Sequence, residues 1–370
     1  MKNVRSRTIQ INYFGAFVTV FCLTLVLAST AVSQEARLVQ EKIHGASLEK
    51  NATGDSADRQ VSIYLPPSYN TSKGKRYPVV YLLHGIGDTD KEFTQAWNGQ
   101  TDAWGTIAGL MNNGIAEGRF GEMIIVMPDE RTKMMGSFYT NSSATGNWED
   151  FTVGDLVNYI DGKYRTIAKA ESRGVAGHSM GGYGAVKLGM KHPEIYSVAY
   201  AMNPALLGWG ADLSIENPAF AALFRMTTPE QLFLGGTYAV GAMCVAQAFS
   251  PNPGKPPFYA DLPFKMVDGK LEPNQAAYEK WEENFPLNMA PRYKANLLRL
   301  RGLRLDTAWE DEFTHIPGIT RALAHKLTDM GVDYIFEEYN GNHRNRMWGR
   351  TGRLYTQVLP YFWLLLDSQK

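Results

Sequence analysis

The stretch "SRGVAGHSMGGYGAVKLGMKHP" (residues 172–193) decides the fold class. Its first part is short and apolar, which predicts a strand, and its second part predicts a helix that Pro193 stops. Between them, residues 177–181 fit the pattern Gly-x-Ser-x-Gly, in which a serine occupies a sharp turn from strand to helix. The pattern therefore predicts a nucleophile elbow centred on Ser179. The alternative is a tight glycine turn without chemistry.

Predicted strands and helices alternate along most of the chain, which is typical of an α/β sheet. Apolar runs bounded by turn residues predict strands at residues 59–65, 77–85, 122–130, 173–178, 195–204, 299–306 and 332–339. Helical spacing of apolar residues predicts helices at 104–117, 150–165, 181–192, 319–330 and 351–366, the last kinked at Pro360. Several of the strands are apolar throughout, so we expect a mostly parallel central sheet with helices on both faces. An edge strand is expected within the polar lead-in.

Residues 205–291 interrupt this alternation with many aromatic side chains and little clear periodicity. The segment is too long for an ordinary connection between sheet elements. We expect an insertion that packs over the carboxyl edge of the sheet, where loops commonly build binding sites. A surface excursion without a role in binding is the alternative.

Among the seven histidines, His343 has the position expected of a general base. A serine hydroxyl is a weak nucleophile until a base accepts its proton. In this architecture the chain order is serine, acid, histidine, and His343 follows the last predicted strand in "YNGNHRNRMWG". His315, in "DEFTHIPG", is the second choice.

The acid that orients this histidine is expected in the loop after the preceding strand, which reads "RLDTAWEDEF". The loop offers Asp306, Glu310, Asp311 and Glu312. Asp306 ends the strand and could instead cap or orient the loop. Asp311 lies farther along and is better able to reach His343, so we choose Asp311.

The oxyanion of a tetrahedral intermediate needs preorganised hydrogen-bond donors. The backbone N–H of Met180, directly after the candidate nucleophile, is one expected donor. The other is expected from the loop after "YLLHG", with the N–H of Ile86 as the choice. The alternative for His84 and Gly85 is a tight turn with no further role.

These motifs together resemble the esterase D/feruloyl esterase branch of the α/β-hydrolases, which includes S-formylglutathione hydrolases, secreted carbohydrate esterases and the antigen 85 mycolyltransferases. The resemblance runs from about Val61 to the C-terminus. It rests on "YLLHGIGD", "MPDE", "NWEDF", "GHSMGGYGA", "DTAWEDEF" and "GNHRNRMW". Ala308 stands where the branch commonly has glycine, and Trp348 matches an aromatic residue that often follows the base.

The resemblance implies the same site residues: nucleophile Ser179, base His343, acid Asp311, and oxyanion donors Ile86 and Met180. It implies no metal and no organic cofactor. Residues 205–291 resemble no substrate-specific pattern, so the resemblance does not extend to acyl or alcohol specificity.

The composition is that of a globular protein without an excess of either charge. The 370 residues are 44% hydrophobic, with 37 Lys plus Arg and 37 Asp plus Glu. This balance favours neither nucleic acid nor an anionic membrane as a partner. The glycine-rich turn is not a phosphate-binding loop, because that loop needs Gly-Lys-Ser/Thr at the helix start and Lys187 lies too far along.

Residues 1–33 match a cleavable secretory signal peptide: positive residues, an apolar run at 13–28, then small residues. The alternative is an uncleaved membrane anchor, but the run is shorter than the ~20 residues of a spanning helix. Cleavage would leave residues 34–370 as the catalytic domain, secreted or periplasmic. Cys244 would then be the only cysteine, so no internal disulfide is expected.

The expected function is that of an exported serine ester hydrolase that acts on small or carbohydrate-linked esters of the feruloyl or acetyl type. If an alcohol outcompetes water, the same machinery is an acyltransferase. A non-catalytic module that binds carbohydrate or envelope components is the alternative from another class. A peptidase of the same fold is disfavoured, because the sequence shows no propeller-like repeat.

Overall fold

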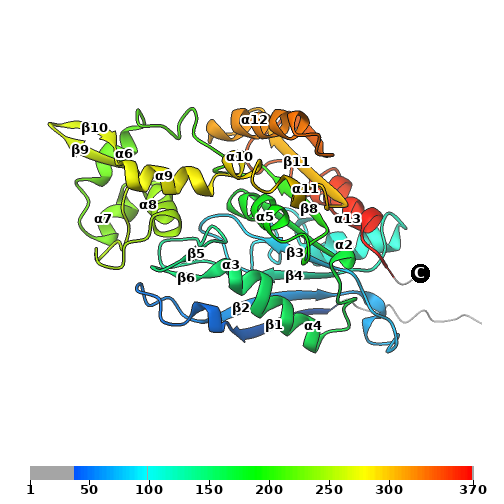
Figure 1. The fold of residues 1–370 in the computed structure, drawn as a ribbon. Coiled ribbons are helices and arrows are strands. Elements are labelled where there is room, and N and C mark those ends of the chain that lie inside the picture. The colour runs from blue at the N-terminus through cyan, green and yellow to red at the C-terminus, as the bar shows by residue number, and fades with distance from the viewer. Residues whose placement is uncertain (1–36, 98, 369–370) are drawn as a thin grey trace, which may run out of the picture. The chain divides into compact units, whose positions relative to one another are not determined.

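An eight-stranded sheet runs through the residues that the computed structural model describes, 37–97 and 99–368 (Figure 1). Its strands are β1 (Arg37–His44), β2 (Asp58–Leu65), β3 (Val79–Leu83), β4 (Ile124–Pro128), β7 (Arg173–His178), β8 (Val198–Met202), β11 (Gly302–Ala308) and β12 (Ile335–Tyr339). Their order in space is β1-β2-β4-β3-β7-β8-β11-β12. Strand β2 is antiparallel to both neighbours, and every pair from β4 to β12 is parallel. The predicted mostly parallel sheet is confirmed, with β1 as its edge strand.

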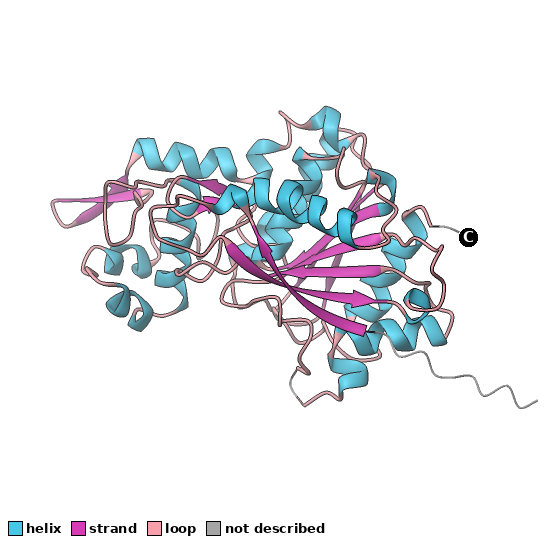
Figure 2. Ribbon diagram, turned by 90° about the horizontal axis from the view of Figure 1, so that it is seen from below, coloured by secondary structure: helices cyan, strands magenta, loops and turns pink. Residues whose placement is uncertain are grey.

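Helices cover both faces of this sheet, as expected (Figure 2). They are α1 (Asp102–Gly105), α2 (Ile107–Ala116), α3 (Trp148–Asp150), α4 (Leu156–Lys163), α5 (Met180–Lys191), α11 (Lys294–Leu297), α12 (His315–Asp329) and α13 (Leu359–Leu365). Turns of π-helix precede α4 at Phe151–Asp155 and α13 at Leu354–Val358. A small hairpin, β5 (Asn141–Ser142) and β6 (Gly146–Asn147), lies outside the sheet.

The inner strands β3, β4, β7 and β8 are buried on both faces, because successive side chains point to opposite sides of a sheet. In β3, Val79, Tyr81 and Leu83 belong to one hydrophobic core, and Val80 and Leu82 belong to the other. Side chains of α4, α5 and α12 close the first core, and side chains of α2 and α13 close the second. This two-sided burial explains why these inner strands are largely apolar.

Three predicted helices have different bounds in the structure. Thr106 is extended and separates α1 from α2, and its hydroxyl caps α2 by accepting from the N–H of Gly109. Helix α12 begins at His315, ahead of the predicted start, because a proline such as Pro317 is tolerated in the first turn. Pro360 likewise lies in the first turn of α13, directly after the π-helical turn, so it starts a helix there.

Residues 205–291 fold into short helices and a hairpin, which Figure 1 shows gathered to one side of the sheet. These elements are α6 (Pro218–Leu223), α7 (Pro229–Leu234), α8 (Thr237–Phe249), β9 (Phe264–Val267), β10 (Lys270–Pro273), α9 (Gln275–Asn284) and α10 (Pro286–Met289). Aromatic stacking holds them together: the ring of Trp209 lies 5.3 Å from Trp281 and 4.9 Å from Tyr278. Most of these helices are too short to give the apolar residues of the sequence a clear helical period.

The predicted signal peptide, and the membrane anchor that was its alternative, lie outside the described residues. Within residues 37–97 and 99–368, none of the helices combines the length and the apolar character needed to cross a membrane.

Candidate functional site

Ser179 occupies the turn between β7 and α5 with a backbone φ of 58° and ψ of −116°. This conformation is costly for a residue with a Cβ atom and persists only where its surroundings impose it. Here the N–H of Ser179 donates to the carbonyl of Met202 at 3.0 Å, and its own carbonyl accepts from Ala205 at 3.1 Å. The turn is thus fixed by backbone bonds to the neighbouring strand and to the start of the 205–291 segment.

The glycines around Ser179 are required by close backbone contacts. A Cβ atom on Gly181 would lie 2.0 Å from the carbonyl oxygen of Leu83, and one on Gly177 would lie 2.2 Å from the carbonyl oxygen of Gly181. Neither position accepts a side chain without moving the backbone. The Gly-x-Ser-x-Gly pattern therefore reflects how closely α5 approaches β3 and β7.

His343 and Asp311 form a buried hydrogen-bonded pair. His343 Nδ1 lies 2.7 Å from Asp311 Oδ2, and the other carboxylate oxygen accepts from the N–H of Phe313 at 2.9 Å. Glu312 also contributes, because its Oε2 accepts from the backbone N–H of His343 at 3.1 Å. A carboxylate only accepts hydrogen bonds, so the His343 proton is on Nδ1 and Nε2 is left as an acceptor.

His178, the neighbour of Ser179, connects the serine turn to His343. The His178 ring lies 4.5 Å from the His343 ring, and its Nε2 donates to the His343 carbonyl at 2.7 Å. Within the described residues, the Ser179 hydroxyl and the His343 ring make no direct hydrogen bond. Such bonds are often long without substrate and tighten when it binds. Burial, followed by electrostatic interactions with the neighbouring His343 and Arg344, holds the pKa of His178 well below its ordinary value, so the His178 ring is neutral.

The other predicted acids have different partners. Asp306 is fully buried in β11 and accepts from Arg353 Nε at 2.7 Å and from the Tyr200 hydroxyl at 2.8 Å. Burial raises the pKa of Asp306, although the neighbouring Arg353 opposes the shift. The Glu310 N–H donates to the carbonyl of Gly341. Asp311 is thus the acid of this loop whose carboxylate bonds to the His343 ring.

Ile86 and Met180, whose backbone N–H groups are the expected oxyanion donors, both lie close to Ser179. Met180 is the first residue of α5, where backbone N–H groups have no partner within the helix. The loop that carries Ile86 lies against the serine, since a Cβ on Gly85 would be 3.5 Å from Ser179 Cβ.

Two side chains stabilise this loop: Glu92, which sequence reasoning passed over, and His84, for which it offered only a tight turn. The N–H of Gly85 donates to Glu92 Oε2 at 2.9 Å. His84 Nε2 accepts from the N–H of Glu130 at 2.8 Å, so its Nδ1 donates to the carbonyl of Gly85 at 2.7 Å. Burial, then the charge of Asp88, raises the pKa of Glu92 to about 8. No local pattern marked Glu92, because its burial is a property of the folded chain.

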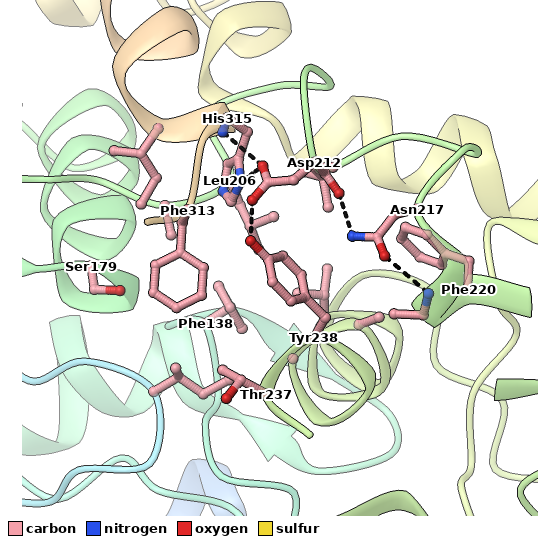
Figure 3. A pocket seen from close by; sticks show the side chains of 18 residues that line it. Phe138, Ser179, Leu206, Asp212, Asn217, Phe220, Thr237, Tyr238, Phe313 and His315 are labelled. Carbon is pink, nitrogen blue, oxygen red and sulfur yellow. Dashed lines mark hydrogen bonds and ion pairs between the residues drawn. The ribbon is translucent and has the colours of Figure 1, made fainter. Parts of the chain in front are cut away.

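A mainly apolar pocket opens beside Ser179 (Figure 3). Ile86 and Ser179 line it, together with Phe138 and Phe313 and with side chains of the 205–291 segment. His343, Asp311 and Met180 do not line this pocket; His343 and His178 line a small separate cavity.

The pocket also contains a polar cluster that the sequence did not reveal. His315, the second choice for the base, has its own acid in Asp212, with Nδ1 2.8 Å from Oδ1. Tyr238 donates its hydroxyl hydrogen to the same carboxylate (Figure 3). Asp212 is 103 residues from His315, so no local motif could join them.

Among the described residues, no group of three or more histidine, cysteine or acidic side chains is arranged to hold a metal ion.

The sheet order and the strand-to-helix serine turn define an α/β-hydrolase fold, and a solved structure of a ferulic acid esterase agrees. It matches with a TM-score of 0.61 over 90% of this chain and 99% of its own, at 21% sequence identity. At that identity the likeness concerns the fold alone. More particularly, residues 53–351 match the model of the family described as "Putative esterase", and the chain belongs to that family.

Two curated relatives match shorter stretches. An esterase of Mycobacterium tuberculosis is 39% identical over 136 residues, which are 36% of this chain and 26% of the relative. An endo-1,4-beta-xylanase/feruloyl esterase of Xylanibacter ruminicola is 31% identical over 138 residues, 36% of this chain and 18% of the relative. The chain thus spans about a quarter or less of these relatives' length.

Proposed function

We propose that the chain is an exported serine carboxylic-ester hydrolase, with Ser179 as nucleophile, His343 as base and Asp311 as the acid that orients it. The observation that carries the proposal is the strained elbow at Ser179 beside the buried pair of His343 and Asp311. Membership of the esterase family supports the reaction class.

Hydrolysis would proceed in two stages. His343 Nε2 accepts the Ser179 proton while Oγ attacks the ester carbonyl carbon, and the N–H groups of Ile86 and Met180 hold the oxyanion. Asp311 stabilises the imidazolium through Nδ1. His343 then passes the proton to the leaving alcohol and an acyl-enzyme remains. Water repeats the sequence: His343 accepts its proton, the acid product leaves, and the proton returns to Ser179.

For the substrate, we propose small or carbohydrate-linked esters of the feruloyl or acetyl type. The apolar pocket beside Ser179 suits the acyl part of such an ester. A curated relative named as an endo-1,4-beta-xylanase/feruloyl esterase agrees with this choice. The predicted signal peptide, residues 1–33, supports action outside the cytoplasm.

The test is hydrolysis of a small panel: p-nitrophenyl acetate, p-nitrophenyl butyrate, methyl ferulate and acetylated xylan. We expect activity that Ser179→Ala removes, while Ser72→Ala, a serine on a turn outside the pocket, retains it. Melting curves establish that both variants fold. Activity indifferent to Ser179, or none on any ester, would overturn the proposal, and new esters formed with an added alcohol would indicate an acyltransferase.

A further inference from the structure

Asp212, Tyr238 and His315 form a cluster in the wall of the pocket that Ser179 also lines (Figure 3). His315 approaches one carboxylate oxygen of Asp212 twice, with its Nδ1 at 2.8 Å and its backbone N–H at 2.7 Å. The other oxygen accepts from the N–H of Thr314 at 3.0 Å and from the Tyr238 hydroxyl. The carboxylate therefore fixes both the backbone and the ring of His315.

These contacts also fix the proton on the ring. Partial burial opposes ionisation of Asp212, but hydrogen bonds from His315 and Tyr238 outweigh it and hold the pKa of Asp212 below its ordinary value. An ionised carboxylate only accepts hydrogen bonds, so Nδ1 of His315 is the protonated nitrogen. In the neutral imidazole, Nε2 is then a hydrogen-bond acceptor.

This acceptor has no partner within the described part of the chain. His315 is 6% exposed, and its Nε2 is buried and makes no hydrogen bond there. Most buried polar atoms in proteins are paired, so an unpaired one calls for an explanation. Phe138, Phe220 and Phe313 contribute aromatic surface to the same pocket.

General-base chemistry does not account for His315. His343 already has its own buried acid and contacts His178, the residue next to the nucleophile. His315 instead starts α12 and belongs to the pocket wall, with an acid supplied by the 205–291 segment. An oriented imidazole in an apolar wall is suited to recognising one polar group of a bound molecule.

We propose that Nε2 of His315 accepts a hydrogen bond from a hydroxyl group on the acyl part of the ester, and so selects hydroxylated aryl acids. The inference rests on the proposed function, because it takes this pocket as the acyl site. The phenylalanines suit an aryl ring. An acyl group without the hydroxyl leaves Nε2 desolvated and unpaired, which weakens its transition state.

The experiment compares esters of equal shape. Methyl esters of ortho-, meta- and para-hydroxycinnamic acid are each compared with the corresponding methyl-substituted cinnamate, at pH 8, where histidines are ordinarily neutral. Four proteins are assayed: the unmodified full chain, His315→Asn, His315→Gln and His325→Asn. Asparagine keeps a donor for Asp212 but removes the atom at Nε2, and glutamine returns a polar group near it. His325 is an exposed residue of α12 and is the matched control.

We expect the best hydroxylated ester to exceed its methyl analogue in kcat/KM by roughly tenfold or more. His315→Asn should lower this ratio to near one, His315→Gln should restore part of it, and His325→Asn should leave it unchanged. Absence of any hydroxyl preference in the unmodified chain would overturn the inference. An unchanged ratio in His315→Asn, with both esters slowed equally, would show a purely structural role and overturn it too.

Binding to Ser179→Ala separates this inference from the proposed function. Titration calorimetry with the same ester pairs gives the ratio of Kd values without turnover. A hydroxyl preference that His315→Asn removes in the Ser179→Ala background would uphold the inference even if no ester is hydrolysed. If Ser179→Ala binds the hydroxylated ester and its methyl analogue with equal affinity, with or without His315→Asn, the inference is overturned whatever the hydrolysis assay shows.

Discussion

Asp306 and Asp311 belong to the same strand and loop, yet their carboxylates have different partners. Asp306 lies within β11 and is paired with Arg353, whose guanidinium also reaches Glu337 at 2.7 Å. Asp311 lies beyond the strand and is paired with His343. The loop thus separates a structural carboxylate from one that orients an imidazole.

Substitution of each acid by asparagine should separate these roles. Asp311→Asn should lower kcat/KM by about three to four orders of magnitude, because the amide no longer fixes the His343 tautomer. Asp306→Asn removes one of the two carboxylates that Arg353 contacts and leaves the contact with Glu337, so it should lower the free energy of unfolding by about 1–3 kcal/mol. Ester hydrolysis and urea denaturation measure the two effects. Equal loss of activity per folded molecule in both variants would contradict the assignment.

At the scale of elements, the serine turn is set by how closely β7, α5 and β3 approach. Sequence reasoning could predict it, because the glycine spacing, the apolar strand and the helix stopped by Pro193 are all local features. It could not predict the fold of residues 205–291. Their short helices are held by stacking of Trp209 on Trp281 and Tyr278, which are contacts between residues distant in the chain.

Two Gly→Ala variants should show that the serine turn, unlike an exposed helix position, has no space for a Cβ atom. Gly181→Ala places a Cβ 2.0 Å from the Leu83 carbonyl and should destabilise the fold by about 3 kcal/mol or more. Gly162→Ala, on the exposed side of α4 with nothing within 4 Å, should stabilise it by up to about 1 kcal/mol. Thermal and urea unfolding measure both. A Gly181→Ala chain as stable as the unmodified one would refute the close-contact account.

Across the whole molecule, the fold buries carboxyl groups on the carboxyl-edge loops. Burial raises the pKa of Glu92 and of Glu130 to about 8 in each case. Glu130 accepts from Thr152 and from Ser137 at 3.1 Å, and Glu92 accepts from Gly85, so both groups brace loops near the candidate site.

These two groups should make stability fall as pH rises. Their folded-state pKa values, about 8, exceed the ordinary value of 4.5, so between these limits the folded state retains protons that the unfolded state releases. Each group then lowers the free energy of unfolding by up to about 1.4 kcal/mol per pH unit. Its stabilisation is complete below pH 4.5 and is lost as pH rises through 8.

Urea denaturation between those pH values tests this. Glu92→Gln and Glu130→Gln should each flatten the decline seen in the unmodified chain. Glu283→Gln, an exposed residue of α9, is the control and should leave the slope unchanged. Equal slopes in all four proteins would show that the carboxyls are ionised in the folded state.

The chain order of the candidate site could be predicted, and its supporting residues could not. Ser179, Asp311 and His343 each follow a predicted strand, so topology alone gathers them at one edge of the sheet. Their bracing residues, among them Glu92 and His178, act through burial and through contacts that no motif records. The pairing of Asp212 with His315 likewise joins residues that are 103 positions apart, so it depends on the fold of residues 205–291.

The most direct test of the central claim is to identify the residue that becomes acylated. The full chain is mixed with p-nitrophenyl acetate, quenched with acid during turnover, digested and analysed by mass spectrometry. The account predicts an acetyl group on Ser179, absent after Ser179→Ala and strongly reduced after His343→Ala. Turnover with Ser179 unmodified, or an acetyl group on another residue that Ser179→Ala leaves in place, would contradict it.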